Sequence, residues 1–206
     1  MNRICVVTAE AGTYFVIVSR LRQAGLPFAS MLPGDRCEGC ALIITSSREL
    51  THPGERAIAL EDLDENPGVF KGQLLSKLDE GRDVLLVGVD PGTRIGLAVF
   101  YGEANLEYST FSSASWLSRR IGVFVRRVSA KRSVVRVGNG SPAMASKIVD
   151  LLKKEAGNAI IELVDETGTS VRRVRMKGIQ GDQGAAAKIA FRKGEVIGLP
   201  SFRSPL

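Results

Sequence analysis

Carboxylates at the ends of predicted elements are the side chains of this 206-residue chain best placed to do chemistry. Asp90 directly follows an apolar run that is predicted to be a buried strand, and Asp165 and Glu166 follow a second apolar run. Asp182 opens an alanine-rich segment that is predicted to be a helix. Carboxylates that meet at one edge of a sheet repel one another unless a cation lies among them. Because oxygen ligands favour Mg²⁺ or Mn²⁺, all four acids are candidate ligands of such an ion.

The residues that are absent narrow the reaction further. Residues 81–206 contain neither histidine nor cysteine, which excludes Ser/His/Asp and Cys/His nucleophilic catalysis there. A reaction in this region must therefore take its nucleophile from water, and metal ions held by carboxylates activate water for phosphodiester hydrolysis.

Each of these acids also has an ordinary structural interpretation. Asp90 could serve only the tight turn at Pro91-Gly92, because Asp is a common turn residue. Asp165, Glu166 and Asp182 could cap the N-termini of helices that follow them. The sequence leaves both interpretations open.

The charge is divided unevenly along the chain. Residues 1–80 contain eight Lys or Arg and eleven Asp or Glu, a net charge of −3. Residues 81–206 contain 20 Lys or Arg and eleven Asp or Glu, a net charge of +9. The second part is therefore expected to bind a polyanion, most simply DNA or RNA, and a solvated basic surface is the alternative.

Several of these basic residues follow a helical pattern. The apolar residues of 113–128 recur at helical spacing, and four arginines occupy the remaining face of the predicted helix. The residues expected to contact nucleic acid are Arg94, Arg119, Arg120, Arg126, Arg127, Arg132, Arg172, Arg173 and Lys188. A solvated helix face is again the alternative for the arginines.

The order of predicted elements indicates an α/β protein with two domains, 1–80 and 81–206. In the first, strands alternate with helices, which predicts a small parallel sheet with Rossmann-like winding. In the second, three strands form an antiparallel meander that is followed by helix, strand, helix, strand and helix. That is the element order of the ribonuclease H fold, with a mixed five-stranded sheet.

Three motifs in the second part resemble one known group of proteins. They are "VGVDPGTRIGLAV", "LVDETGTS" and "GDQGAAAKIAF", and they resemble motifs of the RuvC and YqgF group of ribonuclease H-like proteins. The resemblance covers about 84–193, and together with the acidic first part the whole chain resembles an archaeal family. It implies that Asp90, Glu166 and Asp182 are catalytic metal ligands of an endonuclease like the Holliday junction resolvases, acting on structured or branched nucleic acid.

The chain departs from both family patterns at three positions. Thr167 stands where YqgF has an arginine, Asn139 lies where RuvC has its second acid, and Ala185 replaces an aspartate of the last RuvC helix. These departures favour the alternative function, a nucleic-acid-binding module with a degenerate ribonuclease H-like site and no catalysis. A resolvase that cuts both strands of a junction is expected to be a two-fold homodimer.

The remaining motifs carry weaker signals. No apolar stretch reaches the length of a membrane span, and the apolar N-terminal run is too short for a signal peptide, so a cytoplasmic protein is expected. The stretch "TAEAGTYF" resembles a phosphate-binding loop but lacks its glycines and lysine, so an ordinary strand-to-helix turn is the preferred interpretation. The Asp-x-Gly-Thr motif after Val89 also occurs in actin-like ATPases, whose two-halved architecture residues 1–80 are too short to complete.

The cysteines are three in number, which argues against a disulfide framework in a cytoplasmic protein. Cys37 and Cys40 have the spacing of a redox pair or of half a zinc site to which His52 would add a third ligand. Two incidental loop cysteines are the preferred interpretation.

Overall fold

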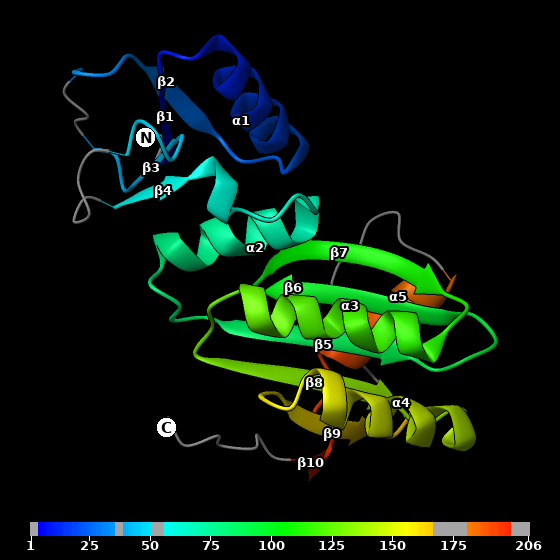
Figure 1. Ribbon diagram of the computed structural model, residues 1–206. Helices are drawn as coiled ribbons and strands as arrows, with labels where there is room; N and C mark the ends of the chain where they lie inside the picture. Colours follow the sequence, from blue (N-terminus) through cyan, green and yellow to red (C-terminus); the bar gives the residue numbers. More distant parts are fainter. Residues whose placement is uncertain (1–3, 36–38, 51–55, 167–180, 199–206) are drawn as a thin grey trace. The chain divides into compact units, whose positions relative to one another are not determined.

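The computed structural model describes residues 4–35, 39–50, 56–166 and 181–198 (Figure 1). The chain divides into two compact units, Met1–Glu80 and Gly81–Leu206. Each unit has its own sheet, so the protein is of the mixed α/β class.

Unit 1 is built on a four-stranded parallel sheet of order β2-β1-β3-β4. Apolar side chains of the sheet pack against two helices, and the second helix begins at Pro67, where the side chain of Asn66 caps it. The elements are β1 Ile4–Val7, α1 Ala11–Gln23, β2 Phe28–Met31, β3 Leu42–Thr45, β4 Ala57–Ala59, a 3₁₀ turn Leu60–Asp62 and α2 Pro67–Leu78.

The cysteines of unit 1 correct the sequence prediction. Cys5 in β1 and Cys40 form a disulfide, with their Cα atoms 6.0 Å apart. The parallel pairing of β1 with β3 explains this, because it aligns Cys5 with Ile43 and so brings the segment before β3 next to β1. Since the Cys40 sulfur is bonded to Cys5, it is not a zinc ligand or part of a Cys-x-x-Cys redox pair. Cys37 and His52 lie outside the described residues.

Unit 2 contains a six-stranded mixed sheet of order β10-β9-β8-β5-β6-β7. Strands β5, β6 and β7 form the expected antiparallel meander, and β8 and β9 continue the sheet parallel to β5. The elements are β5 Val84–Asp90, β6 Ile95–Tyr101, β7 Ala104–Phe111, α3 Ala114–Arg127, β8 Arg132–Gly138, α4 Pro142–Glu155, β9 Ile160–Val164, α5 Gly181–Ala190 and β10 Glu195–Gly198.

Strand β10 corrects the prediction of five strands in unit 2. It pairs antiparallel with β9 at the edge of the sheet, where the sequence indicated only a Gly-, Pro- and Ser-rich tail. The strand has four residues and an irregular register between Val196 and Gly198, so it has too few residues to show the alternation from which strands are recognised.

The helices of unit 2 cover both faces of its sheet. Helix α5 lies on one face, and α3 and α4 lie on the other (Figure 1). Side chains along β5 alternate between these faces. Leu85, Val87 and Val89 are fully buried, whereas Gly88 faces α5, where a methyl group in its place would lie 2.0 Å from the Ala186 carbonyl oxygen.

Candidate functional site

Asp90 lies at the C-terminal end of β5 and shares its face with Gly88, two residues earlier. The side chain therefore points to the side of the sheet on which α5 lies, and it is half-buried. In the antiparallel pairing with β6, Asp90 stands opposite Gly96.

Asp182 reaches the same place from the first turn of α5. A methyl group on Gly96 would lie 2.1 Å from the Asp182 carbonyl oxygen and 3.2 Å from its Cβ. Glycine at position 96 therefore lets the start of α5 rest directly on β6. Gly88 in the same way lets the next turn of α5 rest on β5. These two close approaches put Asp182 beside the end of β5.

Glu166 comes to this edge from the end of β9 and is held by the loop that follows β8. Its backbone N–H donates to Asn139 Oδ1 at 3.0 Å, and its Oε1 accepts from the Gly140 N–H at 2.9 Å. A methyl group on Gly138 would lie 2.1 Å from the same Oε1, so glycine is needed there for the carboxylate to fit. Asp165 is exposed, and its Oδ1 accepts from the Asn139 amide at 3.2 Å.

The electrostatics show that two of the four predicted acids, Glu166 and Asp182, act on a third, Asp90. Burial, and then repulsion by Glu166 and by Asp182, together raise the pKa of Asp90 from its ordinary 3.8 to about 6. Asp165 is not among the groups that raise it. The structure thus brings together Asp90, Glu166 and Asp182 from three separate motifs.

These carboxylates converge without closing into a coordination shell. Within the described ranges, no group of three or more Asp, Glu, His or Cys side chains is close enough to hold one metal ion. Arg94 is a counter-charge at this edge, with its Nε 3.8 Å from Asp182 Oδ2. Its Nη2 also donates to Thr110 Oγ1 at 3.2 Å, so the arginine links the acidic edge to β7.

The predicted basic helix face of α3 is partly occupied by contacts within unit 2. Arg120 pairs with Glu107 of β7, both side chains are largely buried, and the guanidinium lies over the ring of Phe124 at 4.9 Å. Arg126 donates to the Glu155 carbonyl oxygen at 2.7 Å. Arg120 therefore joins α3 to the sheet, and it is poorly placed to contact a phosphate.

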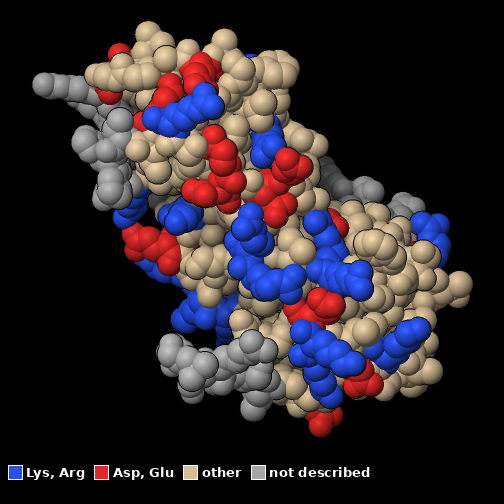
Figure 2. Space-filling view, in the orientation of Figure 1, with Lys and Arg blue, Asp and Glu red and all other residues tan. Residues whose placement is uncertain are grey.

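The other predicted nucleic-acid contacts are distributed over several elements. Arg127, Arg132 and Lys188 are exposed, and basic side chains gather over α3 and α4 in Figure 2. Arg119 is also exposed and lies 3.9 Å from the Glu155 carboxylate. Arg172 and Arg173 lie outside the described residues, as does Thr167.

The residues that position the acids are the part of the site that the sequence did not reveal. Asn139 stood out only as a missing acid, although its amide holds the backbone of Glu166. Gly88, Gly96 and Gly138 carried a usable signal, because glycine within an apolar strand often marks the close approach of another backbone.

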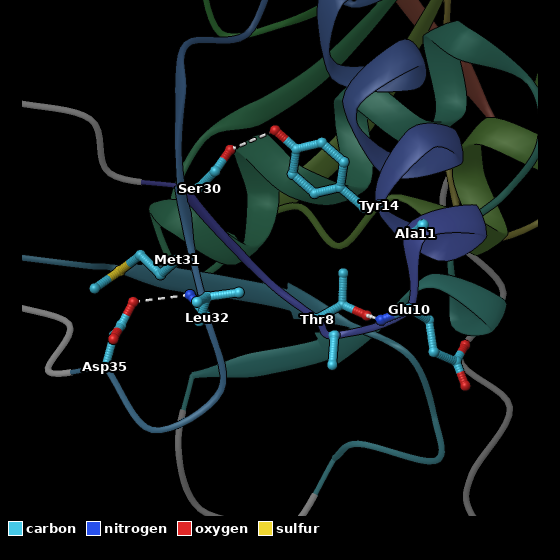
Figure 3. A pocket seen from close by; sticks show the side chains of 9 residues that line it. Thr8, Glu10, Ala11, Tyr14, Ser30, Met31, Leu32 and Asp35 are labelled. Carbon is cyan, nitrogen blue, oxygen red and sulfur yellow. Dashed lines mark hydrogen bonds between the residues drawn. The ribbon is translucent and has the colours of Figure 1, made fainter.

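A pocket in unit 1 bears on the resemblance of residues 8–15 to a phosphate-binding loop (Figure 3). It lies at the C-terminal ends of β1 and β2, and its lining includes the carboxylates of Glu10 and Asp35. The Ala9 N–H donates to Glu49 at 2.7 Å and the Glu10 N–H donates to Thr8 Oγ1 at 3.1 Å. Acidic lining and occupied backbone donors favour an ordinary strand-to-helix turn over a phosphate site.

The comparisons with known proteins give distant structural likenesses and no match in sequence. No protein-family model matches the sequence, and no curated protein matches it. The crystal structure of an Argonaute from Marinitoga piezophila, in complex with a 5′-OH guide RNA and target DNA, matches with a TM-score of 0.32 and 10% sequence identity. The match covers 79% of this chain and 39% of the Argonaute chain.

None of the helices that the structure describes is long and apolar enough to cross a membrane.

Proposed function

We propose that unit 2 is a ribonuclease H-like domain. The support is its topology: an antiparallel meander, then two strands parallel to the first strand of the meander, with helices on both faces. Strand β10 extends the sheet of that fold at its β9 edge. Unit 1, with its parallel sheet, is the Rossmann-like companion domain of this proposal.

We infer that this domain is a divalent-metal-dependent endonuclease for structured or branched DNA or RNA, of the resolvase-like kind that the motifs imply. The observation that carries the inference is the convergence of Glu166 and Asp182 on Asp90 at one edge of the sheet, where both repel the Asp90 carboxylate. Their oxygen-only donors and clustered negative charge fit Mg²⁺ or Mn²⁺, which they would hold. When bound, such ions activate water and stabilise the leaving oxygen of a phosphodiester.

The chain's own residues have separate tasks in this proposal. Asn139 holds the backbone of Glu166 so that its carboxylate stays over Gly138. Contacts of α5 with β5 and β6 fix Asp182. Arg94, which is exposed and adjacent to Asp182, is placed to bind a phosphate of the substrate.

A second candidate function is a nucleic-acid-binding module without catalysis. Two observations favour it: the carboxylates do not form a closed ligand set among the described residues, and Arg94 already pairs with Asp182. In such a module the net charge of +9 of residues 81–206 would bind the phosphate backbone, and the acids would be a remnant.

A cleavage panel with the whole chain separates the two candidates. A four-way DNA junction, a DNA duplex, a DNA single strand and a stem-loop RNA are incubated with Mn²⁺ or with EDTA. A nuclease cuts at least one substrate with Mn²⁺ only, and Asp90→Asn abolishes the cut. Asp150→Asn, which changes an exposed carboxylate of α4, is the matched control and leaves cleavage intact.

The other outcomes are equally informative. Salt-sensitive binding of these substrates without any Mn²⁺-dependent cut refutes the nuclease and supports the binding module. Cleavage that survives in the Asp90→Asn variant refutes the metal role of this edge, and the absence of both binding and cleavage refutes both functions.

A further inference from the structure

Trp116 is an exposed aromatic residue whose position no motif explained. It lies in the first turn of α3, where its backbone N–H donates to the capping hydroxyl of Ser113. The residue is 67% exposed. Tryptophan usually buries most of its surface, and this one contributes little to the core of unit 2. It is also the only tryptophan of the chain.

The strand register puts Trp116 at the same end of the sheet as the three carboxylates, and α3 carries it on the face opposite α5 and the Asp90 side chain. Asp90 pairs with Gly96, and Gly96 pairs with Thr110 near the end of β7. Two strand spacings of about 4.8 Å therefore separate Asp90 from Thr110. Helix α3 begins four residues after Thr110, and Arg94 already spans from Asp182 to Thr110.

A cation accompanies the indole. Arg119, three residues later on the helix, lies over the Trp116 ring with its guanidinium carbon 5.8 Å from the ring centroid. The Glu155 carboxylate lies 3.9 Å from the same guanidinium and helps to hold it. An exposed ring with an arginine beside it offers both a stacking surface and a positive charge for an adjacent phosphate.

We propose that Trp116 and Arg119 form a stacking site for an unpaired nucleobase on the α3 face of unit 2, at the end of the sheet where the acids lie. The proposal rests on the proposed function, because it names the part of the nucleic acid that unit 2 takes: a single-stranded segment, a flap or a loop. A base within an intact duplex has both faces stacked and offers none to the indole. The charge of unit 2 favours nucleic acid over an apolar protein partner as the occupant.

The sole tryptophan makes the proposal directly measurable. The whole chain is titrated in EDTA with a single-stranded 12-mer of thymidylate, with a blunt duplex and with heparin, while tryptophan fluorescence and the anisotropy of labelled DNA are recorded. Stacking predicts that the single strand quenches the fluorescence and that the duplex and heparin, at equal occupancy, do not. Equal quenching by heparin, or anisotropy showing single-strand binding without quenching, overturns the proposal.

Variants give an independent measurement of the same site. Trp116→Ala is expected to weaken single-strand binding about 5- to 150-fold, as truncation of one base-stacking aromatic does. Trp116→Phe should retain part of the affinity, because phenylalanine keeps a smaller stacking face. Phe15→Ala is the matched control, since Phe15 is an exposed aromatic of unit 1, and it should leave binding unchanged.

The failures of the two proposals are distinguishable. If wild-type protein binds none of the probes by anisotropy, the proposed function fails and this inference falls with it. If wild-type binding is salt-sensitive and Trp116→Ala binds the single strand equally well, only the stacking site is refuted.

Discussion

Asp90→Asn is expected to stabilise the metal-free protein at neutral pH. The folded state raises the pKa of Asp90 to about 6, chiefly through burial and then through Glu166 and Asp182, so it disfavours the charged carboxylate. Asparagine keeps the size and the turn preference of the side chain and removes the charge. The substitution therefore removes the cost of burying a charged carboxylate and its repulsion by Glu166 and Asp182, both of which arise only when Asp90 is ionised.

The magnitude follows from the difference between the ordinary pKa of 3.8 and the raised pKa of about 6 for Asp90. Such a difference corresponds to at most about 3 kcal/mol of unfolding free energy. Because Asp90 is only half-buried, solvent screening reduces the expected gain to about 1–2 kcal/mol.

The pH dependence has a definite sign. Between pH 4 and 6 the folded state keeps the Asp90 proton while the unfolded state has lost it, so the free energy of unfolding falls as the pH rises. The contribution of protonated Asp90 to the free energy of unfolding is complete below about pH 4 and is lost above about pH 6. The stability difference between Asp90→Asn and wild type should therefore be small at pH 4 and reach its full value by pH 7.

The assay is chemical denaturation at pH 4, 5, 6 and 7.5, with EDTA or with Mg²⁺. If the edge holds Mg²⁺, the ion stabilises wild type more than the variant and narrows the gap at pH 7.5, since binding to the folded state adds stability by mass action. Asp150→Asn is the control and should show no comparable gap. A variant no more stable than wild type at pH 7.5 in EDTA would refute the electrostatic account of this edge.

Three further predictions concern the contacts that stabilise each unit internally. Gly88→Ala should lower the stability of unit 2 by about 1–3 kcal/mol in urea denaturation, because the added methyl collides with the backbone of α5. Arg120→Ala should cost about 3 kcal/mol by leaving Glu107 buried and unpaired, while the salt dependence of nucleic-acid binding stays unchanged. Reduction of the Cys5–Cys40 disulfide should destabilise unit 1 by about 2–4 kcal/mol, measured by denaturation with and without dithiothreitol.

The sequence was sufficient to place the acids because each one marks an abrupt change of pattern. Asp90 and Glu166 interrupt apolar runs, and Asp182 opens an alanine-rich helix, so all three identify the ends of elements. Once the meander and the two parallel strands were recognised, topology brought those ends to one edge. The parallel sheet of unit 1 was predictable from a different pattern, because a clear helical segment separates its apolar strands.

The sequence was insufficient wherever a contact joins distant segments without leaving a local pattern. The pairing of Arg120 with Glu107 spans a helix and a strand, and the arginine looked like part of a solvated basic face. The disulfide joins Cys5 to a cysteine 35 residues away, although the nearer spacing of Cys37 and Cys40 was the visible one. Side-chain partners of this kind follow only from the three-dimensional packing.

The acidic edge is negatively charged, whereas the unit that carries it has a net positive charge. This difference restricts how closely a phosphate group can approach the edge. Residues 81–206 have a net charge of +9, so a polyanion is attracted to unit 2 as a whole. At the end of β5, however, the same polyanion meets Asp90, Glu166 and Asp182, whose repulsion already raises the pKa of Asp90. Arg94 offsets only part of that charge, because it is one exposed guanidinium beside the Asp182 carboxylate. A phosphodiester can therefore approach these carboxylates closely only when a cation neutralises them, whereas binding to the rest of unit 2 needs none.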